Sequence, residues 1–402
     1  MKILWLTKQV PYPPAYGGDV IYTRHLVEGC ARLGAKIHVI CQSNGDDDYD
    51  FAGANPNITW EILSSALRSR VAATFSRFPN IGARYDTRAH AASLERAIAS
   101  GDWDAIVFDT LAPAAKIYRT RQQLALSKSK PCLVYFSTNH EESVRHTLAR
   151  EARNIAIKVA LFLDAWKTRR LERHCVEYCD LITVVTEDDR VLFSRTFPKQ
   201  RYLVITPGYD GGRARERDLT ELGRTVIILG SYQWIAKRLN LEAFLDAATA
   251  VFPPANIELR IVGFMDPIYR AQLTRRYSWA VIVGPVNDAQ LELAKARIGV
   301  VAEHAGGGFK LKVLDYVFNR VAIAALPEAM NGLPFRPNVH YIAEPTMEQL
   351  AQAIAREVDR TENLRAMADA AFALCETQYD WDRRCAALLD EIAALKAAKT
   401  LA

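Results

Sequence analysis

Residues 298–324 read Ile-Gly-Val-Val-Ala-Glu-His-Ala-Gly-Gly-Gly-Phe-Lys-Leu-Lys-Val-Leu-Asp-Tyr-Val-Phe-Asn-Arg-Val-Ala-Ile-Ala. This order is typical of a strand, a glycine loop, a helix and a second strand. The β-branched run 298–301 predicts the first strand. The three glycines that follow, Gly306, Gly307 and Gly308, let the backbone bend and approach a ligand closely.

The helix is expected to begin near Phe309 and to carry Lys312 and Asp315 on a polar, solvated side. A glycine loop feeding a helix N-terminus suits a phosphate, and the Lys312 ammonium adds a full positive charge. Asp315 is one turn further on, where it is suited to accept hydrogen bonds from ribose hydroxyls. A plain glycine-rich turn followed by ordinary surface residues is the competing interpretation. The spacing matches neither a P-loop nor Gly-x-Gly-x-x-Gly.

Strands alternate with helices on both sides of this stretch, which predicts parallel α/β sheets. Apolar runs indicate strands from Lys2–Leu6 onward in the first half and from Thr225–Leu229 onward in the second. Helical stretches are expected around 61–78 and 85–99. The fold class is therefore α/β, with two Rossmann-like domains that face a cleft.

Three boundaries divide the chain. Residues 208–224 contain three glycines and no apolar periodicity, so they are interpreted as the linker between domain 1–207 and domain 225–378. Residues 379–402 form a final amphipathic helix, which needs a surface on which to bury its apolar side. That side is made up of Ala386, Leu388, Leu389 and Ile392.

Composition limits the class of protein. The 402 residues are 50% hydrophobic with no apolar run long enough to span a bilayer, and the polar Thr7 and Lys8 follow the first apolar residues too soon for a signal peptide. The expected location is cytoplasmic. Seven cysteines without metal-site spacing predict neither a disulfide framework nor a bound metal.

Positive charge is concentrated in the first half. The net charge is only +5, but residues 61–160 hold fifteen Lys and Arg against nine Asp and Glu. This excess suits an anionic lipid surface, which would make the protein peripheral on the inner face of the membrane, or a phosphate-bearing acceptor. A solvated arginine-rich surface explains it equally well. No aromatic-plus-basic module points to nucleic acid.

Other candidate residues follow strands of the first half. Gly17 and Gly18 precede Asp19, a plausible N-cap, and form a second place where backbone can meet a phosphate or a sugar. His140 and Glu142 follow the strand near 131–136, and a histidine with a nearby acid to orient it is suited to polar chemistry at neutral pH. A loop histidine without a role is the alternative.

Several short motifs occur in one order. They are Tyr16-Gly17-Gly18, Arg170-Leu-Glu-Arg ahead of Cys179-Asp-Leu-Ile-Thr-Val-Val-Thr-Glu-Asp, Thr206-Pro-Gly-Tyr-Asp, Gly230-Ser231, and Gly306 to Asp315. Together they resemble the family 4 glycosyltransferases over nearly the whole chain. That resemblance implies the GT-B fold, a nucleotide diphosphate sugar as substrate, transfer with retention of anomeric configuration and no protein-bound metal or other cofactor. It also implies that the final helix, from about Trp381, packs back on the first domain.

The resemblance also implies roles for single residues. The diphosphate would meet Gly306, Gly307, Gly308, Phe309 and Lys312, with Lys237 or Arg238 as a second cation near Gly230 and Ser231. The ribose would meet Asp315, and the base, from UDP or GDP, would lie against Gly284, Pro285 and Val286. In the first domain, Gly17 and Gly18 would lie near the diphosphate, and His140 with Glu142 near the sugar.

This sequence departs from the family pattern in three places. Where many members have two glutamates eight residues apart, it has Gly307 and Asp315. Ser231 replaces a usual arginine, and Asn139 precedes His140 where a related subgroup has His-Asn.

The leading hypothesis is a retaining glycosyltransferase that acts on a glycan or lipid-linked acceptor in polysaccharide or glycolipid biosynthesis. The alternatives are a sugar-nucleotide epimerase, which needs more acids near the sugar than Glu303 offers, and a noncatalytic protein that binds nucleotide sugars or membranes.

Overall fold

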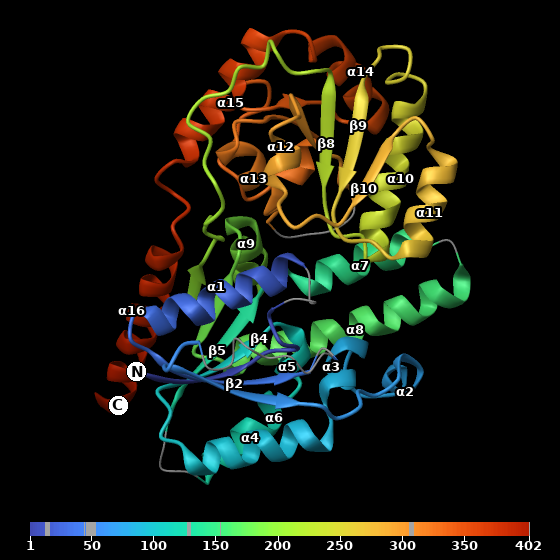
Figure 1. Cartoon of the computed structure of the whole chain (residues 1–402). Helices are drawn as coiled ribbons and strands as arrows, with labels where there is room; N and C mark the ends of the chain where they lie inside the picture. Colours follow the sequence, from blue (N-terminus) through green and yellow to red (C-terminus); the bar gives the residue numbers. More distant parts are fainter. Residues whose placement is uncertain are drawn as a thin grey trace. The chain divides into compact units, whose positions relative to one another are not determined.

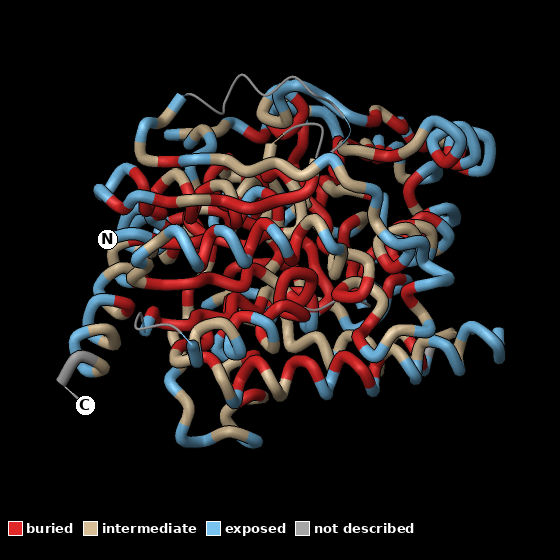
Figure 2. The backbone as a smooth tube through the Cα atoms, turned by 90° about the horizontal axis from the view of Figure 1, so that it is seen from below, coloured by how far each residue is buried: buried red, intermediate tan, exposed pale blue. Residues whose placement is uncertain are grey.

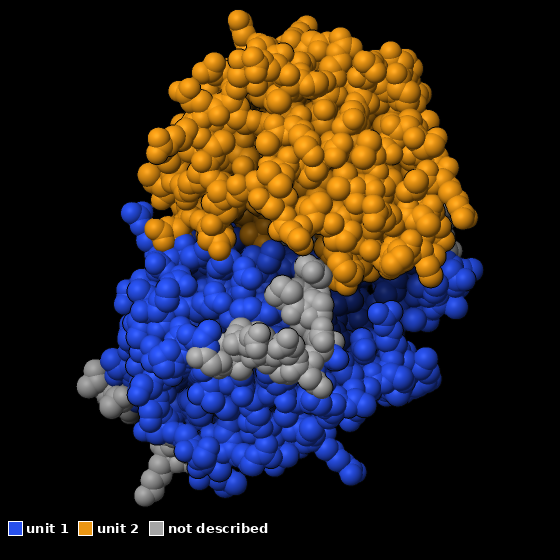
Figure 3. Space-filling view, in the orientation of Figure 1, with its two compact units in different colours: residues 1–207, 381–402 blue, residues 208–380 orange. Residues whose placement is uncertain are grey.

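The chain forms two compact units, residues 1–207 with 381–402 and residues 208–380 (Figure 1). The structure is a computed structural model, and it describes residues 1–12, 17–43, 45, 54–126, 130–152, 154–304 and 309–401. Both units are built on parallel sheets, so the predicted fold class is confirmed. Figure 2 shows buried segments in the interior and exposed turns on the outer helices, and Figure 3 colours the two units.

Unit 1 contains a seven-stranded sheet in the order β3-β2-β1-β4-β5-β6-β7, with every neighbouring pair parallel. The central strands are buried on both faces, as runs of β-branched and aromatic residues predict. Its strands are β1 (Lys2–Leu6), β2 (Lys36–Gln42), β3 (Ile58–Leu63), β4 (Ala105–Asp109), β5 (Cys132–Ser137), β6 (Leu181–Val184) and β7 (Tyr202–Val204).

Ten helices in the described part of unit 1 cover this sheet. They are α1 (Gly18–Arg32), α2 (Arg70–Thr74), α3 (Asn80–Tyr85), α4 (Arg88–Ser100), α5 (Leu111–Ala114), α6 (Ile117–Ala125), α7 (Glu141–Glu151), α8 (Ile155–Tyr178), α9 (Glu187–Thr196) and α16 (Trp381–Leu401). Of the helical stretch predicted around 61–78, only α2 is helical, and the prediction is wrong for its first residues. Residues 58–63 instead pair with β2 along its length, since Ile58, Trp60 and Ile62 alternate with polar residues at strand spacing.

The last helix packs on unit 1, as the sequence predicts. Its Trp381 ring stacks on His25 of α1 with centroids 4.7 Å apart, and its Leu388 and Ile392 side chains are fully buried. Leu389, expected on the same side, is only half-buried. The helix therefore completes the core of the unit in which the chain begins.

Unit 2 has a six-stranded sheet in the order β10-β9-β8-β11-β12-β13, again parallel throughout. Its strands are β8 (Thr225–Leu229), β9 (Glu258–Val262), β10 (Val281–Gly284), β11 (Ile298–Val301), β12 (Ala322–Ala325) and β13 (Ile342–Ala343). Its helices are α10 (Ile235–Thr249), α11 (Pro267–Arg276), α12 (Gln290–Leu293), α13 (Lys312–Phe318), α14 (Met347–Glu357) and α15 (Thr361–Cys375), with the short 3-10 helix η2 (Pro327–Met330).

Residues 208–224, the expected linker, pack against unit 2. The Arg217 guanidinium donates to the carbonyl oxygens of Leu293, Ala294 and Ala296 at 2.8 to 3.0 Å, and Leu219 is buried in the core of the unit. Irregular backbone is thus fixed by a charged side chain rather than by a regular element. In the described residues of either unit, no helix is long and apolar enough to cross a membrane.

Candidate active site

Glu303 lies at the centre of a lysine cluster in unit 2. It follows β11 by two residues, at the carboxyl end of the sheet where parallel α/β folds place ligands. Its side chain is only 3% exposed, with Lys237 and Lys312 Nζ atoms at 2.5 Å and the Lys310 Nζ at 3.8 Å. One carboxylate therefore faces three ammonium groups, and the cluster has an excess of positive charge.

The ionisation of this cluster follows from its burial and charges. Burial would raise the pKa of Glu303, but the charges of Lys312, Lys237 and Lys310 hold that pKa well below its usual range. Burial lowers the pKa of Lys312, although Glu303 opposes that change. The carboxylate is ionised, and among the described residues its single charge does not balance the two close ammonium groups of Lys237 and Lys312. The cluster is therefore suited to an anion.

The helix that supplies Lys312 differs from the sequence prediction. It begins at Lys312 instead of near Phe309, because residues 309–311 form the turn that leads into it. The side of α13 that was expected to be solvated is turned inward, and the Lys312 side chain is only 14% exposed. Gly306, Gly307 and Gly308, predicted to meet the diphosphate, lie outside the described residues.

Asp315 is also partly enclosed. Burial, followed by the charge of Asp210, raises its pKa to about 7, while a hydrogen bond from Tyr209 lowers it. The Tyr209 ring stacks on Phe318 with centroids 4.4 Å apart, which holds it beside α13. The Asp315 carboxyl group can therefore both accept and donate near neutral pH, a property suited to hydroxyl ligands.

The structure separates the two cations that the sequence offered as alternatives. Lys237 joins the cluster around Glu303, whereas the Arg238 guanidinium lies 2.5 Å from Asp266 and donates to the Tyr232 carbonyl at 2.7 Å. Arg238 also lies over the Tyr269 ring, 4.4 Å from its centroid. Lys237 is thus the cation that the cluster adds to Lys312, and Lys310 is a third that sequence reasoning missed.

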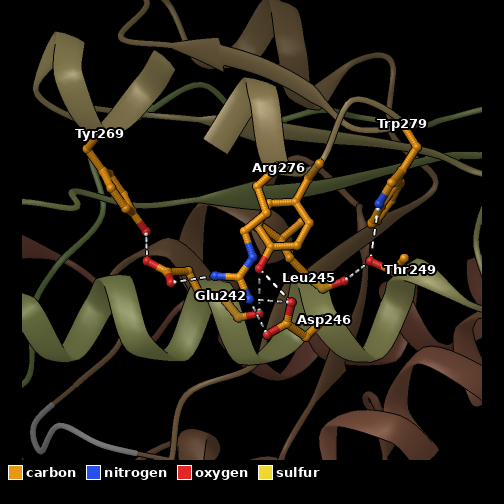
Figure 4. A network of polar contacts seen from close by, with 8 residues as sticks. Glu242, Leu245, Asp246, Thr249, Tyr269, Arg276 and Trp279 are labelled. Atoms are coloured by element: carbon orange, nitrogen blue, oxygen red, sulfur yellow. Dashed lines mark hydrogen bonds and ion pairs between the residues drawn. The ribbon is translucent and has the colours of Figure 1, made fainter. Parts of the chain in front are cut away.

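A polar network fixes the helix that carries Lys237. Figure 4 shows side chains of α11 and the turn after it that bind side chains of α10. Tyr269 donates to Glu242 at 3.0 Å, and Arg276 binds Asp246 through one guanidinium nitrogen at 2.9 Å. The Tyr277 hydroxyl also donates to Asp246, at 2.7 Å. Several contacts of this kind hold α10 in one position, so the Lys237 ammonium is placed by packed secondary structure.

Other predicted donor-binding residues of unit 2 lie after β8 and β10. The Gly230 N–H donates to the Val262 carbonyl at 3.0 Å, and Ser231 follows it. A Cβ on Gly263, which has φ +134°, would lie 1.6 Å from the Gly230 oxygen, so the two backbones meet closely here. Pro285 and Val286 are exposed. The four predicted residues Gly230, Ser231, Pro285 and Val286 thus lie at the same carboxyl edge as Glu303.

In unit 1, the start of α1 and an ion pair between Lys8 and Asp19 follow the carboxyl end of β1. The N-cap of α1 is Gly17, with φ 141°, and not Asp19 as predicted. Asp19 instead pairs with Lys8, and Lys8 and backbone hydrogen bonds lower its pKa against the opposing effect of burial. Gly18 begins the helix and is exposed.

His140 is the N-cap of α7. Its Nδ1 accepts from the Ser143 N–H at 3.3 Å and lies 2.7 Å from the Ser143 hydroxyl, so the ring hydrogen is on Nε2. Burial lowers the pKa of His140, with Glu142 and Asp189 opposing that change. The imidazole is therefore neutral at pH 7 and presents an Nε2–H donor. Its fixed tautomer comes from capping the helix.

The hydrogen-bond partner of this imidazole is not the acid that the sequence suggests. The Glu142 carboxylate lies 3.3 Å from Arg169, so Ser143 orients the imidazole instead. Glu172 was missed: it is buried in α8 and accepts the Glu141 and Glu142 N–H groups at 3.0 Å each. Because it binds the first turn of α7, Glu172 helps to position His140. Its place within the Arg170-Leu-Glu-Arg motif was the available signal.

Sequence position also held a signal for Glu303. Glu303 is a charged residue just after a buried strand, with Lys310 and Lys312 near it in sequence and Lys237 in the βα unit of the neighbouring strand β8, which satisfies the rule for ligand sites at carboxyl ends. The burial of Glu303 could not be predicted from the sequence, because it results from the packing of α10 and α13 around this residue in three dimensions. Among the described residues, no group of three or more His, Cys, Asp or Glu side chains is placed to hold a metal ion.

No protein-family model matches this sequence, and no curated protein sequence matches it. Solved structures do match. Sucrose-phosphate synthase from Thermosynechococcus elongatus aligns with a TM-score of 0.75 at 16% identity, over 99% of each chain. HepE from Anabaena, in complex with UDP and glucose, aligns with 0.66 at 14% identity, over 98% of this chain and 100% of HepE.

WaaG, a glycosyltransferase involved in lipopolysaccharide biosynthesis, aligns with a TM-score of 0.67 at 15% identity, over 96% of this chain and 99% of WaaG. These likenesses extend over both units and agree with the two parallel sheets. At such identities they establish architecture. The chain therefore has the GT-B fold that these glycosyltransferases share.

Proposed function

We propose that this protein is a glycosyltransferase that moves a sugar from a nucleotide diphosphate donor, with retention of configuration, to a glycan or lipid-linked acceptor. The observation that carries the proposal is the lysine cluster of unit 2. Lys237, Lys310 and Lys312 surround one buried carboxylate at the carboxyl edge of a parallel sheet, and they have positive charge in excess. The fold shared with HepE in complex with UDP and glucose supports the choice of ligand.

The cluster is suited to the leaving group of this reaction. As the bond to the sugar breaks, negative charge grows on the diphosphate, and fixed ammonium groups offset it more strongly in the transition state than in the ground state. Glu303 holds the lysines in place before the ligand arrives. Asp315 is assigned to the ribose and His140, through Nε2–H, to the transferred sugar.

Lys312→Ala tests the diphosphate site. Losing one charge-assisted hydrogen bond of about 1.5–3 kcal/mol should weaken UDP binding roughly 10-fold to 150-fold in calorimetric titration. The variant should also be less stable than wild type, because Glu303 loses a partner at 2.5 Å. The sequence alone predicts a solvated lysine, whose loss would hardly change stability, but this side chain is only 14% exposed.

Lys295→Ala is the matched control. Lys295 also pairs with a glutamate of unit 2, at 2.7 Å from Glu292, but is half-exposed and away from Glu303. It should keep wild-type UDP affinity. If folded Lys312→Ala protein also bound UDP as wild type does, the diphosphate would not lie on this cluster.

Labelled donors distinguish the enzyme from its alternatives. A glycosyltransferase should transfer the label or slowly hydrolyse the donor, an epimerase should interconvert two donors, and a noncatalytic protein should bind without turnover. UDP-, GDP- and ADP-sugars belong in one panel, since the base is not determined by the lysines. The anomeric configuration of the product, read by NMR, decides between retention and inversion.

The exposed face of α8 supports a peripheral membrane location for this enzyme. Ile155, Val159, Phe162 and Trp166 follow one another at helical spacing on that face, and Ile155 is 79% and Trp166 56% exposed. The exposed Arg170 continues the same side of the helix. Apolar side chains beside cations are typical of helices that lie in the interface of an anionic bilayer.

Vesicle flotation tests this surface. The protein should bind vesicles that contain anionic phospholipid, less so as salt rises and the Debye length falls below about 8 Å. Trp166→Glu should abolish the binding, whereas Ile268→Glu, at an apolar residue of α11 that is even more exposed, should leave it unchanged. Equal binding by both variants would rule out α8 as the membrane contact.

A further inference from the structure

A small cavity in unit 1 contains a buried lysine without an ion-pair partner. Lys116 follows α5 and is 2% exposed, and its Nζ donates to the Tyr85 carbonyl at 2.9 Å. Within the described ranges, no carboxylate lies within 4.0 Å of this ammonium group. Burial lowers the pKa of Lys116 to about 8, although the charge of Asp86, which makes no ion pair with it, opposes that change, so most of the molecules are still charged at pH 7. An unpaired buried cation is costly to keep, which is typical of functional groups.

A second unsatisfied group lines the same cavity. His90 is 3% exposed, and its Nε2 has no hydrogen-bond partner in the part of the chain that is described. The opposite ring nitrogen, Nδ1, is already bonded to the Thr87 hydroxyl at 2.8 Å. With its hydrogen on Nε2, the imidazole adds a neutral donor to the ammonium group. Donors thus exceed acceptors in this cavity.

Position and size define what the cavity can hold. Leu6 and Ile40, at the carboxyl ends of β1 and β2, form part of its wall, so it lies at the ligand-binding edge of the sheet. It has room for about one water-sized group. A neighbouring cavity shares Thr7 with it and is lined by Lys8 and Asp19. The second cavity also has room for only about one water-sized group, so the first can take no more than a single terminal oxygen of a ligand.

We propose that this cavity binds an anionic oxygen, from a phosphate or a carboxylate, of the acceptor substrate, with Lys116 as its cation and His90 as a further donor. The proposal depends on the proposed function in one respect only, namely that the bound ligand is the acceptor substrate. A negatively charged oxygen matches the unpaired ammonium group. A buried water molecule, the simplest other occupant, would leave the charge of Lys116 unpaired.

Anion-dependent stabilisation tests the proposal with inorganic phosphate and acetate as probes. Phosphate, acetate or both should raise the melting temperature of the wild type, and the apparent Kd should rise at least about tenfold in Lys116→Met. Because phosphate can also bind the lysine cluster of unit 2, only the anion whose effect is weakened in Lys116→Met identifies the acceptor group as phosphate or carboxylate. Lys167→Met is the control, because Lys167 is also buried in unit 1 with its Nζ bonded to a backbone carbonyl, that of Thr74, at 2.6 Å.

His90→Leu supplies an independent variant and should weaken the same anion response without removing a charge. If both cavity variants responded to both anions as Lys167→Met does, the cavity would hold only water and the proposal would be wrong. Titration with UDP separates this result from the donor site. Lys116→Met should bind UDP as wild type does, so an unaltered anion response with normal UDP binding overturns this inference alone.

Discussion

Single residues of the two sites carry much of the pH dependence expected of this protein. Asp315 is the clearest, since burial and Asp210 raise its pKa to about 7 from an ordinary 3.8. Between those two values the folded state keeps a proton that the unfolded state releases. Stability from this group is therefore full below pH 3.8, is lost as pH rises towards 7, and stays lost above it.

Asp315→Asn should remove that loss. The variant should be more stable than wild type by up to about 4 kcal/mol at pH 8, with little difference at pH 4, in urea unfolding followed at both values. Asparagine preserves the size of the side chain and an oxygen for Tyr209. Parallel pH profiles for the two proteins would mean that Asp315 is ionised in the folded state.

His140→Ala tests the proposed role of this side chain in turnover against its structural role as the N-cap of α7. Turnover should fall while UDP affinity stays within about twofold, because an interaction made only in the transition state appears in the rate constant. The change also removes an N-cap, which costs about 1 kcal/mol of stability. His140→Asn is the matched control: asparagine caps well but lacks the imidazole. If His140→Asn had the full turnover of the wild type, the only role of His140 would be to cap the helix.

At the scale of elements, α16 is the helix whose contribution is most readily measured. Leu388→Ala removes a fully buried side chain and should lower the free energy of unfolding by about 2–5 kcal/mol in denaturant titration. Leu389→Ala, one position on and only half-buried, should cost clearly less. Equal losses would show that the helix is not held by the face that contains Leu388.

Elements with strong local patterns were predictable from sequence. The strands Lys2–Leu6, Thr225–Leu229 and Ile298–Val301 match the structure at both ends, because buried parallel strands show in hydrophobic runs alone. Residues 61–78 were largely misread, since β3 ends at Leu63 and only the short helix Arg70–Thr74 follows within this stretch. Their apolar residues satisfy several patterns, and pairing with β2 decides among them.

The sequence indicated which residues share a face of the helix, but not whether their side chains are buried or exposed. Lys312 and Asp315 share a helix face, which spacing alone reveals. Whether that face meets solvent depends on the packing of α13 in three dimensions, and here it turns towards Glu303. For the same reason sequence could not choose between Lys237 and Arg238, which are adjacent in the chain yet bind different carboxylates.

At the scale of the whole molecule, two separate cores predict unfolding that is not two-state. UDP at 100 times its Kd should stabilise the unit that binds it by about 2.7 kcal/mol. Hydrogen exchange should therefore slow in β8, β11 and β12 of unit 2, with little change in β1, β4 and β5. Slowing confined to the strands of unit 1 would place the nucleotide in the wrong unit for the proposed function.

The return of α16 to unit 1 has a consequence for how the protein is made. Unit 2 is inserted between residue 207 and residue 381. The long first segment of unit 1 and its short last segment therefore leave the ribosome far apart in time. Until residues 381–401 emerge, the side of α1 that Trp381 and Cys385 cover has no partner. Nascent chains that stall inside unit 2 should therefore recruit chaperones through α1, although all seven strands of the first sheet are already complete.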